Sequence, residues 1–457
     1  MSTVNTSFNF VLFILSVLTS FVIDINTTFY LLIFYLLGIA VLLINHSLLS
    51  KEIKIHKFIF CAGYAYILAC CVFMKINNYD YLLILDAADS FIPKTQEFLS
   101  HRNFVKSFDA IWSNYTLFNR STPGYYLILT SFGYISTLIG SELYVSLQIG
   151  TLFLSSFTGI LIYKILLKSS IDKSISFRYT LYICLFSYIF FYSTLILRDS
   201  IILLLFLKIC YLFFSKNKVY NLIIIFLLAL GIMFLRLESG LFAFIFIPLY
   251  LLHIFKILTK TEKIFYSFLL FSVYYVIYII VIGNYERLSE AYQLNQESYI
   301  INVAGGSGVI GSLQSLPPII SDVLSVVYTA IQPIPFWAKL YTSGSYNIPE
   351  CYNIMAFPTA IAGFFNFASI FYVFRGIIVK NINTNRTLKW LVFISILFLF
   401  LQSEVVSQRR VLFSYTIFYV VASLSYINTN KKTKHRLNMF ILLAYFLINV
   451  LALLIIA

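Results

Sequence analysis

Apolar runs of membrane-spanning length recur along almost the whole chain, and this pattern restricts the fold more than any other feature of the sequence. A helix needs about 20 predominantly apolar residues to cross a bilayer. Hydrophobic residues make up 60% of the 457 residues and charged residues only 11%, whereas soluble domains average about 25% charged residues. The sequence therefore predicts an all-α polytopic membrane protein with a single integral membrane domain, residues 1–457.

The apolar runs predict about thirteen transmembrane helices, several of them near the lower length limit for a span. Residues 1–7 carry no charge and the first run continues into a second, so we expect no cleaved signal peptide. The expected spans are residues 8–23, 28–48, 58–74, 143–168, 178–197, 199–215, 219–235, 240–258, 264–283, 355–376, 387–403, 411–427 and 437–456.

The run Tyr125–Gly140 decides the orientation of the later spans. If it is a helix at the outer surface, the cytoplasmic loops hold twenty Lys and Arg residues against three acids, and the outer face holds eleven cations against fifteen acids. An excess of Lys and Arg marks cytoplasmic loops. We therefore expect a cytoplasmic N-terminus, an outer C-terminus and two long outer (periplasmic) loops, 75–142 with a surface helix and 284–354 with an interfacial helix.

The net charge of +14 could indicate a nucleic-acid partner, but the loop asymmetry accounts for the excess of cations, and we expect no nucleic acid. Five of the six cysteines lie inside apolar runs, which predicts neither a disulfide framework nor a metal site. No repeat of 20–50 residues is visible, and this weakly disfavours common transporter designs.

Charged residues at the outer ends of the spans are the main candidates for function, because charges near membrane depth are costly and tend to be functional. Each arginine could pair with a neighbouring acid or reach lipid phosphates. Together they could hold a lipid diphosphate, since the guanidinium fork bonds phosphate oxygens two at a time. The set comprises Arg198 with Asp199, Arg236 with Glu238, and Glu404 with Arg409 and Arg410.

Asp86 and Asp89 follow an apolar stretch in the first loop and share a face if that segment is helical. A partly buried carboxylate there could act as a general base toward a sugar hydroxyl; the alternative is a helix cap or a solvated loop face. In the second loop, Trp337 follows a Gly-rich segment and a Pro-rich turn. It could stack on a sugar or simply anchor the chain at the interface. No motif predicts a nucleotide, metal or other cofactor.

At these positions the chain resembles bacterial O-antigen polymerases of the Wzy type, within the wider GT-C glycosyltransferases that use polyprenyl-linked sugars. It differs from GT-C enzymes that carry a soluble C-terminal domain, and its first two spans form an extra hairpin. The resemblance covers residues 75–425 loosely. It rests on Asp86 and Asp89, Thr122-Pro123-Gly124-Tyr125, Ile162-Tyr163-Lys164, Leu197-Arg198-Asp199-Ser200, Pro333-Ile334-Pro335-Phe336-Trp337 and Arg409-Arg410.

The resemblance implies a bacterial inner-membrane polymerase that acts at the periplasmic face. A hydroxyl of one lipid-linked oligosaccharide would attack the anomeric carbon of a sugar carried on a polyprenyl diphosphate. Asp86 or Asp89 would be the base, and Arg198, Arg236, Arg409 and Arg410 would hold the diphosphate. Asp199, Glu238, Glu404 and Trp337 would support them. The implied partners are the polyprenyl-diphosphate-linked oligosaccharide, the bilayer and a chain-length regulator.

Two other functions fit the sequence. A GT-C transferase would add a single sugar from a polyprenyl phosphate donor. A flippase or transporter would move the lipid-linked sugar, although the two long loops on one face and the outer arginines argue against it. A ladder of repeats in the product, a single-sugar mass shift, or lipid movement without a new glycosidic bond would distinguish the three.

Overall fold

All helices of the described chain are α-helical except one short π-helical turn, η1, and no strand occurs among these residues. The computed structural model describes residues 2–44, 50–78, 87–114, 123–169, 171–215, 218–254, 317–331, 357–378, 386–401 and 410–456, with parts of 259–282. In chain order the helices are α1 (Ser2–Val22), α2 (Ile25–Ile44), α3 (Ser50–Ile76), η1 (Ala87–Phe91), α4 (Ile92–Leu99), α5 (Phe104–Asn114), α6 (Pro123–Ile139), α7 (Leu143–Lys168), α8 (Lys173–Phe186), α9 (Tyr188–Ser193), α10 (Arg198–Leu212), α11 (Lys218–Leu235), α12 (Leu237–Phe244), α13 (Phe246–Ile254), α17 (Pro318–Ile331), α20 (Pro358–Ile378), α21 (Arg386–Leu401), α22 (Leu412–Asn428) and α23 (Lys431–Ile456).

Six helical segments of the described chain are long and apolar enough to cross a membrane, and four further apolar helices are shorter. The predicted class, an all-helical multi-pass membrane protein, is therefore confirmed. The six segments are Ile25–Ile44, Lys51–Ile76, Leu143–Lys168, Leu237–Ile254, Pro358–Ile378 and Lys431–Leu451.

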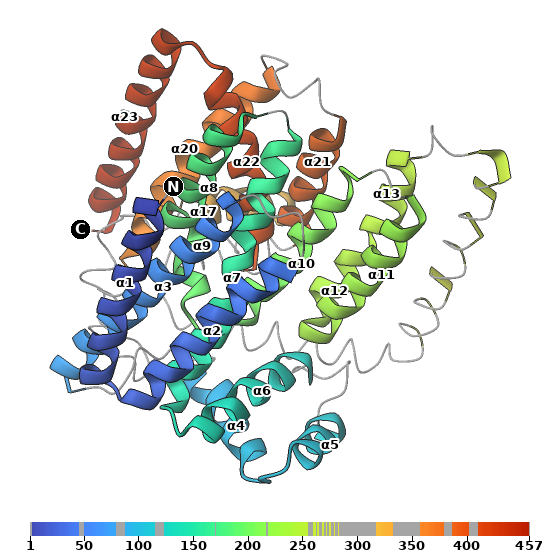
Figure 1. The fold of residues 1–457 in the computed structure, drawn as a ribbon. Coiled ribbons are helices and arrows are strands. Elements are labelled where there is room, and N and C mark those ends of the chain that lie inside the picture. Colours follow the sequence, from blue (N-terminus) through green and yellow to red (C-terminus); the bar gives the residue numbers. More distant parts are fainter. Residues whose placement is uncertain are drawn as a thin grey trace.

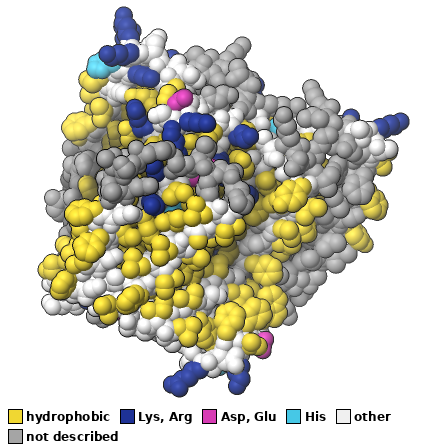
Figure 2. Space-filling model, viewed as in Figure 1, with side chains coloured by type: hydrophobic (Ala, Val, Ile, Leu, Met, Phe, Trp, Pro, Cys, Tyr) yellow, Lys and Arg dark blue, Asp and Glu magenta, His cyan; other side chains and the backbone are white. Residues whose placement is uncertain are grey.

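Helix α7 lies at the centre of the bundle, packed against α3 and α10, and 83% of its most apolar segment is buried (Figure 1). The short helices α4, α5 and α6 gather at one end of the molecule, which we call the loop end. At the opposite end, the basic end, α3 and α23 begin and α7 finishes. Figure 2 shows Lys and Arg side chains concentrated there, with a broad hydrophobic surface between the two ends.

Acidic side chains cap the first turns of two helices. Glu142 accepts a hydrogen bond from the backbone N–H of Val145 (2.7 Å) at the start of α7. Asp172 accepts from the N–H groups of Ser174 (2.7 Å) and Ile175 (3.4 Å) at the start of α8. These N–H donors stabilise the ionised form and lower the pKa of the Asp172 carboxyl. Both caps satisfy backbone donors that a helix leaves without internal partners.

Two of the expected spans are interrupted helices. The run 178–197 divides into α8 and α9 at Ser187, whose hydroxyl accepts from the N–H of Ile189 (3.2 Å). The run 240–258 contains α12 and α13, which meet at Ile245. After α9, the carbonyl of Thr194 accepts from Nε2 of Gln148 (3.0 Å), a side chain of α7. Apolar periodicity does not reveal such breaks, because both halves remain hydrophobic.

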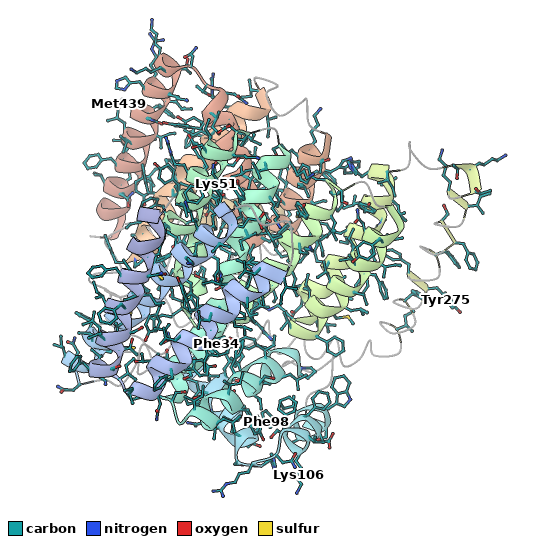
Figure 3. The ribbon with its side chains drawn as sticks, in the orientation of Figure 1. Phe34, Lys51, Phe98, Lys106, Tyr275 and Met439 are labelled. Atoms are coloured by element: carbon teal, nitrogen blue, oxygen red, sulfur yellow. The ribbon has the colours of Figure 1, made fainter. Side chains whose placement is uncertain are left out.

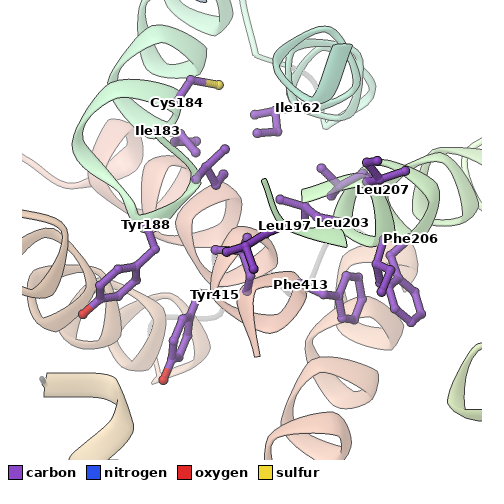
Figure 4. Close-up of a cluster of buried hydrophobic side chains, with 14 of the residues drawn as sticks. Ile162, Ile183, Cys184, Tyr188, Leu197, Leu203, Phe206, Leu207, Phe413 and Tyr415 are labelled. Carbon is purple, nitrogen blue, oxygen red and sulfur yellow. The ribbon is translucent and has the colours of Figure 1, made fainter. Parts of the chain in front are cut away.

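The hydrophobic core includes aromatic side chains that join helices far apart in the sequence (Figure 4). The rings of Phe206 on α10 and Phe413 on α22 lie 4.8 Å apart. Those of Tyr188 on α9 and Tyr415 on α22 lie 6.0 Å apart. Bilayer tails are as apolar as these side chains, so close packing rather than water exclusion accounts for such contacts inside the membrane.

Near the basic end, a glycine lets the ring of a buried histidine contact the backbone of α2. His56 on α3 is fully buried, and its Nδ1 lies 2.8 Å from the hydroxyl of Ser156 on α7. That hydroxyl donates to the carbonyl of Phe153 (2.6 Å), so His56 Nδ1 carries the proton and donates to Ser156. The Nε2 of His56 lies against Gly38, where a Cβ would collide with it.

We expect Gly38→Ala to destabilise the protein by about 1–3 kcal/mol, the usual cost of overpacking. The ring of His56 is enclosed and cannot move away from the added methyl group. The measurement is unfolding in detergent. The double variant Gly38→Ala with His56→Ala should be more stable than the two separate losses predict, because removing the ring removes the collision. Strictly additive losses would contradict this contact.

Candidate functional site

Two neighbouring helix links at the loop end carry the charged residues that the sequence singled out. Leu197 is extended (φ −137°, ψ 136°) and precedes α10, which begins at Arg198. Arg236 is also extended (φ −160°, ψ 121°) and separates α11 from α12. The N–H of Arg236 still donates to the carbonyl of Ile232 (2.8 Å) in α11, and its own carbonyl accepts from Gly240 (3.0 Å) in α12. Arg236 is therefore fixed by both helices.

The two links bind each other through their arginines. Arg198 donates from Nη1 to the carbonyl of Leu235 (3.2 Å), at the end of α11. Arg236 donates from Nη1 to Oδ1 of Asp199 (2.5 Å), in the first turn of α10. Helix ends favour this arrangement, since an acid suits the N-terminus of a helix and a cation suits its C-terminus.

The Arg236–Asp199 pair is buried, with side-chain exposures of 7% and 2% respectively. A buried ion pair is stable only when its geometry compensates for the loss of solvation, and removing one partner leaves a costly charge behind. The short contact and the fixed backbone on both sides meet that requirement. Removal of either side chain should therefore destabilise the protein.

Arg410, in the turn before α22, lies at the same cavity as this pair. Two guanidinium cations and one carboxylate give the cavity a net charge of +1. Its volume of about 10 Å³ is roughly the space that one water molecule requires. The cavity is lined by Asp199, Ile202, Leu203, Phe206, Arg236, Ser239, Phe398, Arg410, Leu412 and Phe413.

Aromatic rings form the apolar side of the cavity. Phe206 lies 5.9 Å from Phe398 and 4.8 Å from Phe413, between ring centroids. Phe398 lies 4.4 Å from Phe242 of α12. These rings join α10, α12, α21 and α22 beneath the charged groups. An apolar wall lowers the local polarity and strengthens the attraction between the arginines and an anion.

The structure brings together only part of the predicted set. Arg236, Arg410 and Asp199 line one cavity, and Arg198 lies beside it on the α10–α11 contact. Glu238 is exposed and is not among the residues that line the cavity, and the acid that Arg236 bonds is Asp199. The residues Asp86, Trp337, Glu404 and Arg409 lie outside the described residues.

Asp89 belongs to η1, of which the structure describes the backbone at that position. The η1 turn packs on α6, where the rings of Phe91 and Tyr125 lie 4.8 Å apart. The start of α6 in turn contacts the end of α11, because a Cβ on Gly124 would lie only 2.5 Å from the carbonyl oxygen of Phe234. The first loop is thus packed onto the segment that leads directly into Arg236.

Sequence reasoning missed the pairing between the two links. It considered each arginine with the acid nearest in sequence, whereas Arg236 pairs with Asp199, 37 positions away. One signal was present: basic residues near position 217 lie midway between Arg198 and Arg236. If the chain reverses direction there, α10 and α11 run antiparallel, and Arg236 at the end of α11 lies beside Arg198 at the start of α10. Ser239 and the aromatic wall carried no such signal.

Comparisons of the chain with protein-family models, with curated proteins and with solved structures found no match. Among the described residues, no group of three or more His, Cys, Asp or Glu side chains is placed to hold a metal ion. The two arginines of the cavity can form charge-assisted hydrogen bonds to an anion such as a phosphate.

Proposed function

We propose that the protein is a membrane glycosyltransferase that polymerises lipid-linked oligosaccharide repeat units, as O-antigen polymerases do. One observation carries the proposal: Arg236 and Arg410 meet in one positively charged cavity at the ends of membrane helices. Arginine is the side chain best suited to phosphate oxygens. A donor whose sugar is attached to a lipid diphosphate would present those oxygens at this depth of the bilayer.

The proposal includes the finer topology that the sequence predicts: about thirteen spans in a GT-C-like arrangement, and a bacterial inner membrane with the loop end on the periplasmic side. The concentration of Lys and Arg at the basic end (Figure 2) supports this orientation. In Figure 3, Lys51 lies toward the basic end and Lys106 lies at the loop end.

In the proposed reaction, the oxygen of an acceptor hydroxyl forms a bond to the anomeric carbon of the donor sugar. The bond from that carbon to the lipid diphosphate breaks, and the hydroxyl proton passes to a carboxylate, for which Asp86 and Asp89 remain the candidates. Arg236 and Arg410 would stabilise the negative charge that develops on the diphosphate. Arg198 and Asp199 would hold Arg236 in place through the contacts described above.

The cavity must widen to admit a diphosphate, because its present volume suits a water molecule. Arg410 is only partly buried, and rotation of its long side chain toward the membrane surface would widen the cavity without backbone motion. Arg236 keeps its Nη1 contact with Asp199 in this proposal and offers its other N–H groups to the phosphate. Arg410 supplies a second cation, so the two arginines match the two negative charges of a diphosphate diester.

We expect Arg410→Ala to lower the rate of polymer formation on the order of 100-fold, the usual cost of losing one group that stabilises developing charge. Arg410→Lys should recover only part of the activity, because an ammonium group cannot form a bidentate contact. The measurement is the glycan ladder from a complemented strain, or from purified protein supplied with lipid-linked repeat units.

Arg375→Ala is the matched control, because Arg375 lies near the basic end, where its Nε donates to Thr429 (3.0 Å). We expect a normal ladder at equal expression. A full ladder from the Arg236→Ala and Arg410→Ala variants would overturn the proposal. A single-sugar mass shift would instead support a monosaccharide transferase, and lipid movement without a new glycosidic bond would support a flippase.

A further inference from the structure

Helix α5 has three distinct faces, and one of them is apolar and exposed. Ser107 and Ile111 are buried, and the Ser107 hydroxyl donates to the carbonyl of Phe98 in α4 (2.5 Å). Beside this buried face lies a stripe with helical spacing, Phe104, Phe108 and Trp112, whose exposures are 49%, 41% and 51%. We call these three residues the α5 stripe. The third face is polar.

The α5 stripe continues the exposed apolar surface of a neighbouring helix. The rings of Phe108 and Trp112 stack 6.2 Å apart with an interplanar angle of 3°. Trp112 in turn stacks on Phe234 of α11 at 5.9 Å. Phe234 lies seven residues after Leu227, so both occupy the same face of α11. Leu227 is 58% exposed on that face.

The exposed face of α11 belongs to an apolar helix of a membrane protein, and lipid tails are the surroundings that suit it. Trp112 stacks on Phe234 and so extends this apolar surface from α11 to α5. The lipid that covers the exposed face of α11 should therefore also cover the α5 stripe. The polar face of α5, with Lys106, Asp109 and Ser113, points the other way and is exposed. Lys106 marks the far limit of the loop end in Figure 3.

We propose that α5 lies in the membrane interface at the loop end, with the α5 stripe against lipid acyl chains and its polar face in water. An amphipathic helix of this kind places its apolar face about 5–10 Å into the head-group boundary. Aromatic side chains favour that depth, and tryptophan most of all. The partner is the bilayer itself, and the proposal does not depend on the enzymatic reaction.

The test is fluorescence from Trp112 alone. The chain has three tryptophans, so Trp337→Phe with Trp390→Phe leaves Trp112 as the only one, and excitation at a wavelength that tyrosine does not absorb isolates its emission. In phosphatidylcholine vesicles, lipids brominated near the head group should quench this emission more than lipids brominated near the chain end. Acrylamide in the water should quench it only weakly. The single-Trp390 protein, from Trp112→Phe with Trp337→Phe, calibrates both quenchers.

Two matched variants of the single-Trp112 protein separate the stripe from the rest of α5. Phe108→Asp should reduce quenching by brominated lipid and increase quenching by acrylamide, because a carboxylate draws the stripe into water. Ser113→Asp adds the same charge to the polar face and should leave quenching by brominated lipid and quenching by acrylamide unchanged. Circular dichroism checks that each variant is folded.

Two results would overturn the proposal. In the first, acrylamide quenches Trp112 and brominated lipid does not, which would place the α5 stripe in water. In the second, neither quencher acts and Trp112 becomes accessible only when the protein is diluted into excess lipid, which would show that a second copy of the chain covers the stripe.

Discussion

Replacing Arg236 by methionine is expected to cost about 3–5 kcal/mol of folding free energy, because the buried Asp199 carboxylate then loses its ion pair with Arg236. Both side chains are almost fully enclosed, so solvent cannot replace the lost partner. Unfolding of the purified protein in detergent, followed by circular dichroism, measures this loss. Polymer formation should fall as well, since Arg236 is a proposed phosphate ligand.

The double variant Arg236→Met with Asp199→Leu separates stability from function. It removes both charges, and apolar replacement of a buried ion pair is often neutral or stabilising. We expect most of the lost stability to return while polymer formation stays low. If the double variant regained activity together with stability, Arg236 would be a structural residue only, and the phosphate-binding role would be wrong.

The ion pair between Glu52 and Lys164, near the basic end, is the matched comparison. Its N–O distance is 3.2 Å, and the lysine side chain is 29% exposed. Water can solvate this cation when its partner is removed, so Glu52→Gln should cost less than Arg236→Met. It should also leave polymer formation intact, because the pair lies far from the loop end. An equal loss of activity would point to a general effect of destabilisation.

Gly240→Ala should separate α12 from α11 and displace Arg236, with a loss of stability of about 3 kcal/mol, near the upper end of the overpacking range. A Cβ at position 240 would collide with the backbone of Met233, at Cα and N, rather than with a flexible side chain. The collision lies one helical turn from Arg236. Thermal unfolding and the glycan ladder together measure the effect.

Gly231→Ala provides the control on the same hairpin. A Cβ there would meet only the Cδ1 atom of Leu205, at an ordinary contact distance of 3.8 Å. Alanine also raises helix propensity, so this variant should be as stable as the parent or slightly more stable. Similar behaviour of the two variants would show that the α11–α12 approach has no role in placing Arg236.

The sequence predicted long uninterrupted helices well, because apolar runs report membrane spans directly. The expected span 143–168 coincides with α7 (Leu143–Lys168), and 355–376 is close to α20 (Pro358–Ile378). The break at Ser187 was missed. A single serine within an apolar run is common in membrane helices, and nothing in its local spacing indicates that Ser187 is extended and caps a new helix. Contacts between distant residues leave no periodic signal.

The candidate site was predicted in part for the same reason. Charges at span ends are rare enough to identify Arg198, Asp199, Arg236 and Arg410 from the sequence alone. Their pairing depends on which helices are neighbours, and this was not available from local spacing. The roles of Asp86, Arg409, Glu404 and Trp337 stay predictions, as these residues lie outside the described part of the chain.

The interrupted helix α8–α9 has a consequence for how the protein enters the membrane. Carbonyl groups at the end of α9 face polar side chains of α7: Thr194 accepts from Gln148 (3.0 Å), and Ser193 shares the hydroxyl proton of Ser155 (3.3 Å) with Leu152 (3.1 Å). In lipid, these carbonyls would have no partner, at a cost of several kcal/mol each. Helix α7 precedes α9 in the chain and leaves the ribosome first. We therefore expect α9 to enter the membrane against the polar side chains of α7 rather than alone.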